Sequence, residues 1–157
     1  MEGAPLDLLI REAREDDVPA VVALLAADSV GGHGDTTEPA ALPDYVRAFK
    51  RIARSPNDSL YVAELDGDVV GTFQTTLITT LLGRGVAQLK VEAVHTRADM
   101  RGKGVGAAMM RFAVELANQA GAKSVQLTSN KARRDAHRFY ARLGFEESHV
   151  GFKMKLR

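Results

Sequence analysis

One stretch of the sequence combines the residue types that bind anions. Residues 100–112 read MRGKGVGAAMMRF, with Gly102, Gly104 and Gly106 on alternate positions directly before an apolar pattern of helical spacing. Glycine lets backbone N–H groups approach a ligand with no Cβ in the way. A helix N-terminus adds unpaired N–H groups and the positive end of the helix dipole. The stretch therefore predicts an anion site, and its alternative is a tight turn that binds nothing.

Two common phosphate-binding motifs do not fit this stretch. The P-loop requires G-x-x-x-x-G-K-[ST], but Lys103 is followed by Gly104, which leaves no hydroxyl for a magnesium ion. The sequence G-K-G-V-G-A also lacks the spacing of the dinucleotide motif G-x-G-x-x-G. Both motifs usually follow an early strand of a βαβ unit, whereas this stretch follows the fourth predicted strand. Neither motif therefore explains the anion site.

The elements that position this stretch alternate between helical and strand periods. Acidic residues and Pro19 at the start, followed by apolar residues at helical spacing, predict the first helix. A two-residue period on both sides of Asp66-Gly67-Asp68 predicts a hairpin. In chain order we expect a strand at 6–13, a helix at 14–28, a loop at 29–43, a helix at 44–55, and strands at 59–65, 69–81 and 86–96.

The second half of the chain follows the glycine stretch. We expect a helix that ends at Gly121, a strand at 123–129, a helix at 133–143 that ends before Gly144, and one or two strands within 145–157. The order is β-α-α-β-β-β-α-β-α-β. This order predicts a layered α/β fold with a mixed sheet.

Length and composition limit the class of protein. The 157 residues predict one domain, and the apolar (45%) and charged (26%) shares are those of a soluble globule. No apolar run reaches the roughly 20 residues of a membrane span, and the first ten residues do not resemble a signal peptide. The absence of cysteine excludes disulfides and a cysteine nucleophile, and the four histidines have no metal-ligand spacing. We expect a cytoplasmic protein with no metal and no membrane partner.

Charge is divided unevenly along the chain. Residues 1–96 carry 8 basic and 15 acidic side chains, a net charge of −7, and residues 97–157 carry 13 basic and 5 acidic, a net charge of +8. The second half should therefore attract a polyanionic ligand and the first half a cation, unless the split is incidental surface charge. We expect no nucleic-acid partner, because the basic half has no cluster interleaved with aromatic residues.

A more specific pattern, R-x-x-G-x-G, is formed by Arg101, Gly104 and Gly106 between a predicted strand and a predicted helix. It resembles the pyrophosphate loop of the GNAT superfamily of acetyl-CoA-dependent N-acetyltransferases. The stretch QLTSNKARRDAHRFYARLGF (126–145) is similar to the second half of that fold, in which a helix ends in Tyr-x-x-x-Gly-Phe. Together with the order of elements, the resemblance covers essentially the whole chain. It implies a GNAT-like fold, in which helices flank a mixed, mostly antiparallel sheet, and acetyl-CoA as the acyl donor.

The resemblance also implies which residues bind acetyl-CoA. In the family, the strand before the loop splays from its neighbour at a bulge, and its exposed backbone pairs with the pantetheine arm. The family often has an asparagine seven positions before the helix tyrosine. Here that position is Arg133 and the nearest asparagine is Asn130, so either residue could make the contact. Thr96 stands where the family usually has an apolar residue. The implied cofactor-binding residues are Val94, His95, Thr96, Arg101, Gly102, Lys103, Gly104, Val105, Gly106, Ala107, Asn130 and Arg133.

Two catalytic side chains are implied in the same way. Glu92 matches the position of the general base in many family members, and its alternative is a salt-bridged strand residue. Tyr140 matches the tyrosine near the thioester sulfur, a general acid for the leaving thiolate, and its alternative is a packing role. A backbone N–H near Val94 is the expected donor to the developing oxyanion.

The acceptor is expected to be a primary amine, either a small molecule or a peptide and preferably cationic. In the family it enters over the first two helices and the loop between them, where this chain has the GGHGD segment (31–35) with His33. Six acidic residues fall in this region: Asp16, Asp17, Asp28, Asp35, Glu38 and Asp44. We expect direct transfer within a ternary complex, because no nucleophile is apparent. A homodimer is left open. The alternative function is a non-catalytic, acyl-CoA-binding regulatory module.

Overall fold

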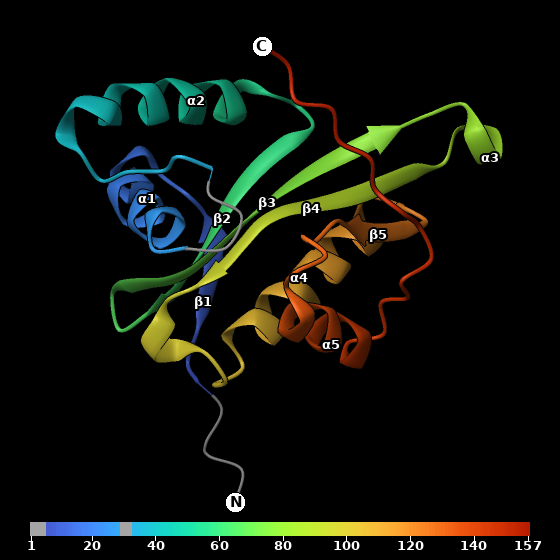
Figure 1. The fold of residues 1–157 in the computed structure, drawn as a ribbon. Coiled ribbons are helices and arrows are strands. Elements are labelled where there is room, and N and C mark those ends of the chain that lie inside the picture. The colour runs from blue at the N-terminus through green and yellow to red at the C-terminus, as the bar shows by residue number, and fades with distance from the viewer. Residues whose placement is uncertain (1–5, 29–32) are drawn as a thin grey trace, which may run out of the picture. The chain divides into compact units, whose positions relative to one another are not determined.

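In the described part of the chain, five strands form one sheet in the order β1-β2-β3-β4-β5 (Figure 1). The first four pair antiparallel, and β5 pairs with β4 in parallel, so the predicted mixed, mostly antiparallel sheet is confirmed. The strands are β1 (Leu9–Glu12), β2 (Asp58–Leu65), β3 (Asp68–Thr79), β4 (Ala87–Thr96) and β5 (Ser124–Leu127). Asp66 and Gly67, at φ of +52° and +86°, form the tight turn between β2 and β3.

Four helices of the described chain lie close to the predicted ranges, whereas the sequence pattern did not predict the single turn at Leu82–Gly85. The helices are α1 (Val18–Ala26), α2 (Leu42–Arg54), the single turn α3 (Leu82–Gly85), α4 (Val105–Gln119) and α5 (Arg134–Arg142). Short 3-10 turns at Glu15–Asp17, Pro39–Ala41 and Ala98–Met100 precede α1, α2 and the glycine stretch. The predicted helix at 14–28 therefore begins only at Val18, after its acidic first turn.

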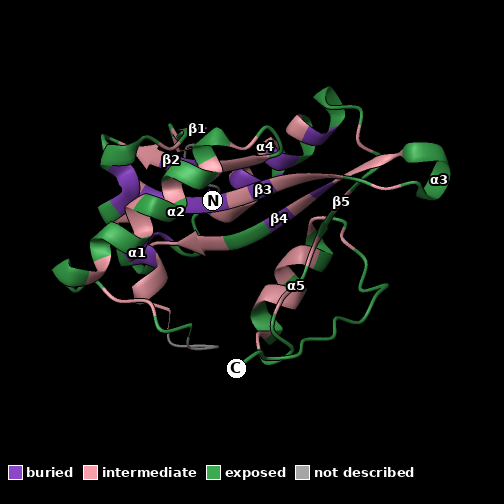
Figure 2. Cartoon of the chain, turned by 90° about the horizontal axis from the view of Figure 1, so that it is seen from above, coloured by how far each residue is buried: buried purple, intermediate pink, exposed green. Residues whose placement is uncertain are grey.

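This computed structural model describes residues 6–28 and 33–157. The chain forms two units, Met1–Leu127 with the whole sheet and Thr128–Arg157 with α5. Residues 29–32, which belong to the predicted loop at 29–43 and include two glycines of the GGHGD segment, lie outside the described part. In the first unit, buried residues concentrate in the central strands, in α1 and in α4 (Figure 2). In the second unit, α5 has no buried residue.

One face of the sheet packs tightly against α4. A Cβ added to Gly71 in β3 would lie 2.9 Å from the sulfur of Met109 and 3.1 Å from a methyl carbon of Val105. Phe73 is fully buried and contacts Phe112 of α4 edge-on, with 6.4 Å between ring centroids. The glycine on β3 therefore allows the helix that follows the glycine stretch to lie close to the sheet.

The opposite face of the sheet lies under α1 and α2 (Figure 1). Side chains alternate along a strand, so Thr72 and Gln74 point away from α4, toward Val22 of α1 and Phe49 of α2. Helix α2 has no buried residue, whereas Val21 and Val22 of α1 are only 6% and 5% exposed. This face is less completely packed than the α4 face.

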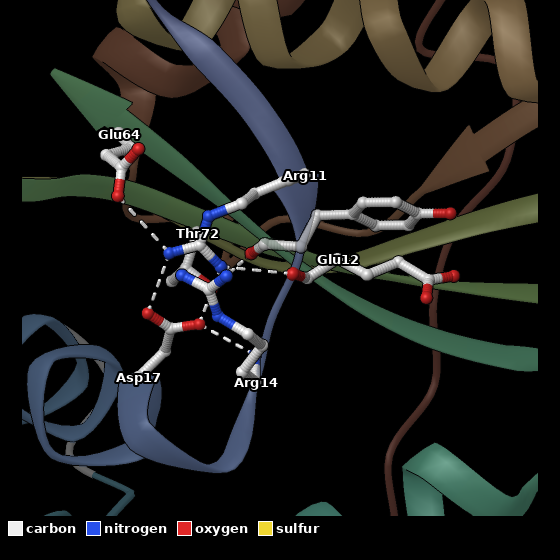
Figure 3. A network of polar contacts seen from close by, with 7 residues as sticks. Arg11, Glu12, Arg14, Asp17, Glu64 and Thr72 are labelled. Atoms are coloured by element: carbon white, nitrogen blue, oxygen red, sulfur yellow. Dashed lines mark hydrogen bonds and ion pairs between the residues drawn. The ribbon is translucent and has the colours of Figure 1, made fainter. Parts of the chain in front are cut away.

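A half-buried ion-pair network joins β1, β2 and the start of α1 (Figure 3). Both terminal nitrogens of Arg11 donate to the carboxylate of Asp17, at 2.7 and 2.9 Å, and one also reaches Glu64 at 3.4 Å. The backbone N–H of Arg14 donates to Asp17 at 2.6 Å. The side chains of Arg11 and Asp17 are 17% and 10% exposed. The hydrogen bonds from Arg11 lower the pKa of the Asp17 carboxyl, despite its burial.

The prediction of one or two strands within 145–157 is wrong, and these residues form neither helix nor strand. Val150, Phe152, Met154 and Leu156 alternate with glycine or basic residues, but all four are at least 80% exposed. Alternation provides a strand with two distinct faces, but a strand also needs a ladder partner. The sheet ends at β5, and no described strand pairs with this segment.

Candidate functional site

The glycine stretch forms the connection that the sequence predicts, between the end of β4 and α4. Gly102 and Gly104 have φ of +75° and +88°, in the left-handed region that favours glycine. Gly104 is the N-cap of α4, and at either glycine no described atom beyond the adjoining residues lies within 4 Å of the position of an added Cβ. Gly106 lies inside the first turn of α4. The space beside the two left-handed glycines is therefore open.

Unpaired backbone donors point out of the start of α4. Ala108 donates its N–H to Gly104 at 3.0 Å, which is the first helical bond, so the N–H groups of Val105, Gly106 and Ala107 precede the ladder. The first turn of α4 has no acidic residue. The side chain of Val105 is buried at 1% exposure, whereas Arg101 and Lys103 are exposed. This arrangement of donors and positive charge suits a phosphate group.

A bulge interrupts β4 just before this connection. Thr72 pairs with His95 and Gln74 pairs with Glu92, so two residues of β4, Ala93 and Val94, stand opposite the single residue Phe73. Ala93 has a φ of +52°, which costs a non-glycine residue about 1 kcal/mol or more. Strain of this kind persists only where the surrounding structure imposes it.

Beyond the bulge, β4 has an open edge. Its pairing with β5 ends at Val91 with Leu127, but β4 continues to Thr96. Val94, His95 and Thr96 therefore have β3 on one side and no strand of the described chain on the other. The N–H and C=O groups on such an edge can pair with an extended ligand.

Glu92 lies on the sheet face that is covered by α1 and α2. Gln74, which pairs with Glu92, points to that face. Thr72 points to the same face and pairs with His95, so Glu92 and His95 share it. The carboxylate of Glu92 is 3.0 Å from the amine of Lys90, and its side chain is 48% exposed. The ion pair agrees with the alternative reading of Glu92 as a salt-bridged strand residue. The exposure leaves the carboxylate of Glu92 accessible to a ligand.

A cavity of about 620 Å³ opens on the same face. It is lined by Leu25, Asp28, His33, Gly34, Asp35, Ala93 and His95. Tyr45 of α2 donates its hydroxyl to Asp35 at 2.8 Å and accepts the N–H of Thr36 at 3.2 Å, which holds this part of the loop against α2. The cavity therefore joins acidic residues to the strained bulge.

Two of the six acidic residues in the predicted acceptor region line this cavity. Asp28 and Asp35 line the cavity, but Asp17 is buried in the network with Arg11 and does not line it. Asp44 forms an exposed ion pair with Arg47 on its own helix. The sequence could not show that Asp17 has a partner on β1, because the contact depends on how β1 and the 3-10 turn pack. Asp16 and Glu38 are exposed and do not line the cavity.

In the second unit, the Tyr-x-x-x-Gly-Phe signature is a helix terminator. Gly144 has a φ of +99°, its N–H donates to Ala141 at 3.1 Å, and the N–H of Phe145 donates to Tyr140 at 3.0 Å. This is the Schellman arrangement, and the rings of Phe145 and Tyr140 make the accompanying contact at 5.7 Å. Burial raises the pKa of the Tyr140 phenol, while Arg133 acts to lower it. The backbone hydrogen bond and the ring contact with Phe145 hold Tyr140 in place, which agrees with a packing role. The raised pKa means that the phenol is protonated at neutral pH.

Asn130 and Arg133 begin α5 in this unit. The side-chain Oδ1 of Asn130 accepts the N–H of Ala132 at 2.9 Å. The backbone carbonyl oxygen of Asn130 lies 2.9 Å from Nε2 of His137. Arg133 is the N-cap residue of α5, and its N–H donates to Asn130 at 2.9 Å. Asn130 therefore shapes the turn before α5.

Sequence reasoning missed Ala93, Leu25 and Tyr45 as residues of the site. Leu25 and Tyr45 read only as apolar positions on helices, and alanine at 93 gives no signal of a positive φ. The resemblance alone suggested a bulge in this strand, and the register of β3 with β4 reveals where it falls.

Two features are absent from the part of the chain that the structure describes. No group of three or more His, Cys, Asp or Glu side chains is arranged to hold a metal ion. No described helix has the length and apolar character needed to cross a bilayer.

Comparison with known proteins gives the class. The Acetyltransferase (GNAT) family matches residues 8–145. An aminoalkylphosphonate N-acetyltransferase of Salmonella typhimurium is 47% identical over 57 residues, which are 36% of this chain and 37% of the relative. An uncharacterized N-acetyltransferase of Methanocaldococcus jannaschii is 33% identical over 104 residues, which are 65% of this chain and 45% of the relative. The matches thus span less than half the length of these curated relatives.

The crystal structure of a transcriptional regulator from Bacillus halodurans has a TM-score of 0.91 and 39% identity, covering 95% of this chain and 99% of that one. The left-handed glycine loop, the bulged strand and the family match agree with one another. This chain belongs to the GNAT acetyltransferase family.

Proposed function

We propose that this protein transfers an acetyl group from acetyl-CoA to a primary amine, directly and within a ternary complex. The observation that carries the proposal is the open, bulged edge of β4, which leads straight into the glycine connection and the start of α4. A strand edge that no described strand covers, followed by a glycine turn at the start of a helix, suits a long ligand with an amide-containing arm and a pyrophosphate.

The donor would bind through the backbone of the first unit. The N–H groups at the start of α4, with Gly102 and Gly104, would hold the pyrophosphate, and Arg101 and Lys103 would add positive charge at the rim. The peptide groups of Val94 to Thr96 would pair with the pantetheine arm as a neighbouring strand does. Asn130 and Arg133 remain candidates for further contacts, and the family pattern is their support.

An acceptor that starts as an ammonium loses two protons from its nitrogen, one before the attack and one as the tetrahedral intermediate collapses, and the thiolate gains one proton. Glu92 would accept a proton from the ammonium, directly or through water, and the amine nitrogen would then attack the thioester carbonyl carbon. A C–N bond forms, and the C–S bond breaks. The N–H of Val94 would donate to the oxyanion, and Tyr140 would protonate the thiolate. The second nitrogen proton would restore the phenol of Tyr140 after that group has protonated the thiolate, and the first would pass from Glu92 to water. The raised pKa of Tyr140 keeps the phenol protonated at neutral pH, as a proton donor must be, but it also makes the phenol a weaker acid.

The acceptor would be a cationic amine. Asp28 and Asp35 line the cavity beside the bulge, and negative charge attracts an approaching ammonium. The same charge opposes loss of the ammonium proton, which makes a base more necessary. An aminoalkylphosphonate is a second candidate acceptor, and the relative that bears that name is its support.

A second function is a regulatory module that binds acyl-CoA without turnover. The observation in its favour is the Bacillus halodurans structure, which is described as a transcriptional regulator.

Release of the CoA thiol against a panel of amines tests both functions. The panel holds polyamines, aminoglycosides, lysine-rich peptides, acidic amino acids and an aminoalkylphosphonate, at two salt concentrations. We expect amine-dependent thiol release, with an acceptor KM that rises with salt because exposed charges are screened beyond about 10 Å at 0.1 M. Binding of acetyl-CoA with no thiol release for any amine would support the regulatory module. A preference for acidic acceptors would contradict the cationic acceptor.

A further inference from the structure

A second, smaller cavity lies on the same face of the sheet as the acidic cavity. Its volume is about 150 Å³, and α1, α2 and the strands β2, β3 and β4 contribute to its wall. Residues that define it include Val22 and Leu25 of α1, Ala48 and Phe49 of α2, and Thr72 and Ala93 of the sheet. We call it the inner cavity, and the 620 Å³ cavity the outer cavity.

The inner cavity is apolar. None of its lining residues is charged, and the polar ones are Tyr45, Thr72 and Gln74. The hydroxyl of Thr72 donates to the carbonyl oxygen of Tyr61 at 2.8 Å, and the hydroxyl of Tyr45 donates to Asp35 at 2.8 Å. Two of the three polar side chains are thus already engaged outside the cavity. Such a space favours a hydrocarbon group over a polar one.

The two cavities meet at the bulge of β4. Leu25 and Ala93 line both of them, and Ala93 is the residue held at a φ of +52°. The outer cavity adds Asp28 and Asp35 at this junction, whereas the inner cavity adds only neutral residues. A ligand whose reactive atom lies beside Ala93 can therefore place a charged part in one cavity and an apolar part in the other.

We propose that the inner cavity is a specificity subsite that receives an apolar substituent of the acceptor amine. The inference rests on the proposed function, because the proposed transfer occurs at the bulge where the cavities join. A dry cavity of about 150 Å³ lined by Leu, Ile and Phe can bind benzene, so the group that fits is about the size of a phenyl ring or a branched alkyl chain. The acceptor is then a primary ammonium with a phenyl-sized group on a short linker, rather than a linear polyamine.

The test compares amines of equal charge, and two variants that each replace an exposed alanine on α2 with leucine. The substrates are ethylamine, 2-phenylethylamine and 2-(1-naphthyl)ethylamine. Ala48 lines the inner cavity and Ala53 does not, although both are exposed alanines on α2, so Ala48→Leu is the test variant and Ala53→Leu its matched control. Binding of 2-phenylethylamine without acyl donor is measured by calorimetry as a readout that does not need turnover.

We expect kcat/KM for 2-phenylethylamine to exceed that for ethylamine by roughly 10- to 100-fold, as burial of a phenyl group predicts. The naphthyl amine, too large for the cavity, should lose most of that gain. Ala48→Leu should weaken 2-phenylethylamine binding and lower its kcat/KM about 10-fold relative to that of ethylamine in the same variant, while Ala53→Leu should keep the wild-type ratio.

Failure of the apolar subsite and failure of the proposed acetyl transfer give different results. If amines are acetylated but 2-phenylethylamine and ethylamine have equal kcat/KM, the proposed subsite is wrong and the proposed function stands. If no amine in either panel is acetylated, the proposed function fails, and phenylethylamine binding that is insensitive to Ala48→Leu then removes the subsite as well. The wild-type substrate series decides the question even if the Ala48 variant does not fold.

Discussion

Gly104 has a φ of +88° at the start of α4, with open space where a side chain would be. Gly121 at the end of α4 is a matched position, with a φ of +72° and no described atom beyond the adjoining residues within 4 Å of an added Cβ. Gly104→Leu and Gly121→Leu should each lose about 1–2 kcal/mol of stability from the left-handed backbone. Only Gly104→Leu should lose the rise in melting temperature on adding acetyl-CoA or CoA. An equal rise in both variants would show that the loop does not hold the pyrophosphate.

Glu92 is the residue on which the proposed proton transfer depends. Glu92→Gln should lower kcat by roughly 10²- to 10⁴-fold and leave acetyl-CoA affinity unchanged, because it removes only the proton acceptor. The loss should be largest at low pH, where the amine is charged. Steady-state kinetics across pH and calorimetry with acetyl-CoA measure both parts. Glu115→Gln, an exposed carboxylate on α4, is the control. Full activity of Glu92→Gln would assign the residue to its ion pair with Lys90.

Tyr140 and Tyr45 should respond differently to loss of their hydroxyls. Tyr140→Phe should lower kcat within the same roughly 10²- to 10⁴-fold range, because the phenol is the proposed proton donor. Tyr45→Phe removes the hydrogen bond to Asp35 and should raise the acceptor KM with a smaller change in kcat. Initial rates at saturating and limiting amine distinguish the two effects. A Tyr140→Phe enzyme with normal kcat and reduced stability would mean that this ring only packs against Phe139 and Phe145.

At the scale of elements, the Arg11 network holds β1, β2 and α1 together. The pKa of Asp17 is lowered in the folded protein, so its contribution to stability is complete above its unfolded pKa of about 3.9 and is lost as pH falls through the folded value. Asp17→Asn should cost about 3 kcal/mol at pH 7, and the gap to the wild type should shrink below about pH 4.

Urea unfolding between pH 7 and pH 2.5 measures this gap. Asp44→Asn, which breaks an exposed ion pair with Arg47, should change stability by less than about 1 kcal/mol at any pH. A gap between wild type and Asp17→Asn that stayed constant to pH 2.5 would contradict a lowered pKa for Asp17.

Elements with a strong local signal could be predicted from the sequence, and those that depend on distant contacts could not. The hairpin at Asp66 and Gly67 and the end of α4 before Gly121 are confirmed, because glycine in the left-handed region marks both. The strand predicted within 145–157 was wrong, because alternation alone does not provide a partner. The strained Ala93 and the inner cavity arise from the register of β3 with β4 and from helix packing, which no local pattern records.

At the scale of the whole molecule, the charge split gives the two ligands different electrostatic conditions. The loop proposed for the pyrophosphate begins the half of the chain with a net charge of +8, and the outer cavity belongs to the half with a net charge of −7. CoA affinity and acceptor affinity should therefore both fall as ionic strength rises, each through its own charges. Calorimetry with CoA alone at two salt concentrations isolates the first effect, and an affinity for CoA independent of salt would contradict it.

The central claim is direct transfer of the acetyl group from donor to amine. The measurement is acetyl transfer from acetyl-CoA labelled with carbon-13 in the acetyl group, with mass spectrometry of both the amine and the protein, and initial rates with both substrates varied. We predict the label on the amine nitrogen, none on the protein, and intersecting double-reciprocal lines. Label on the protein with parallel lines, or thiol release with no labelled amine, would contradict the claim.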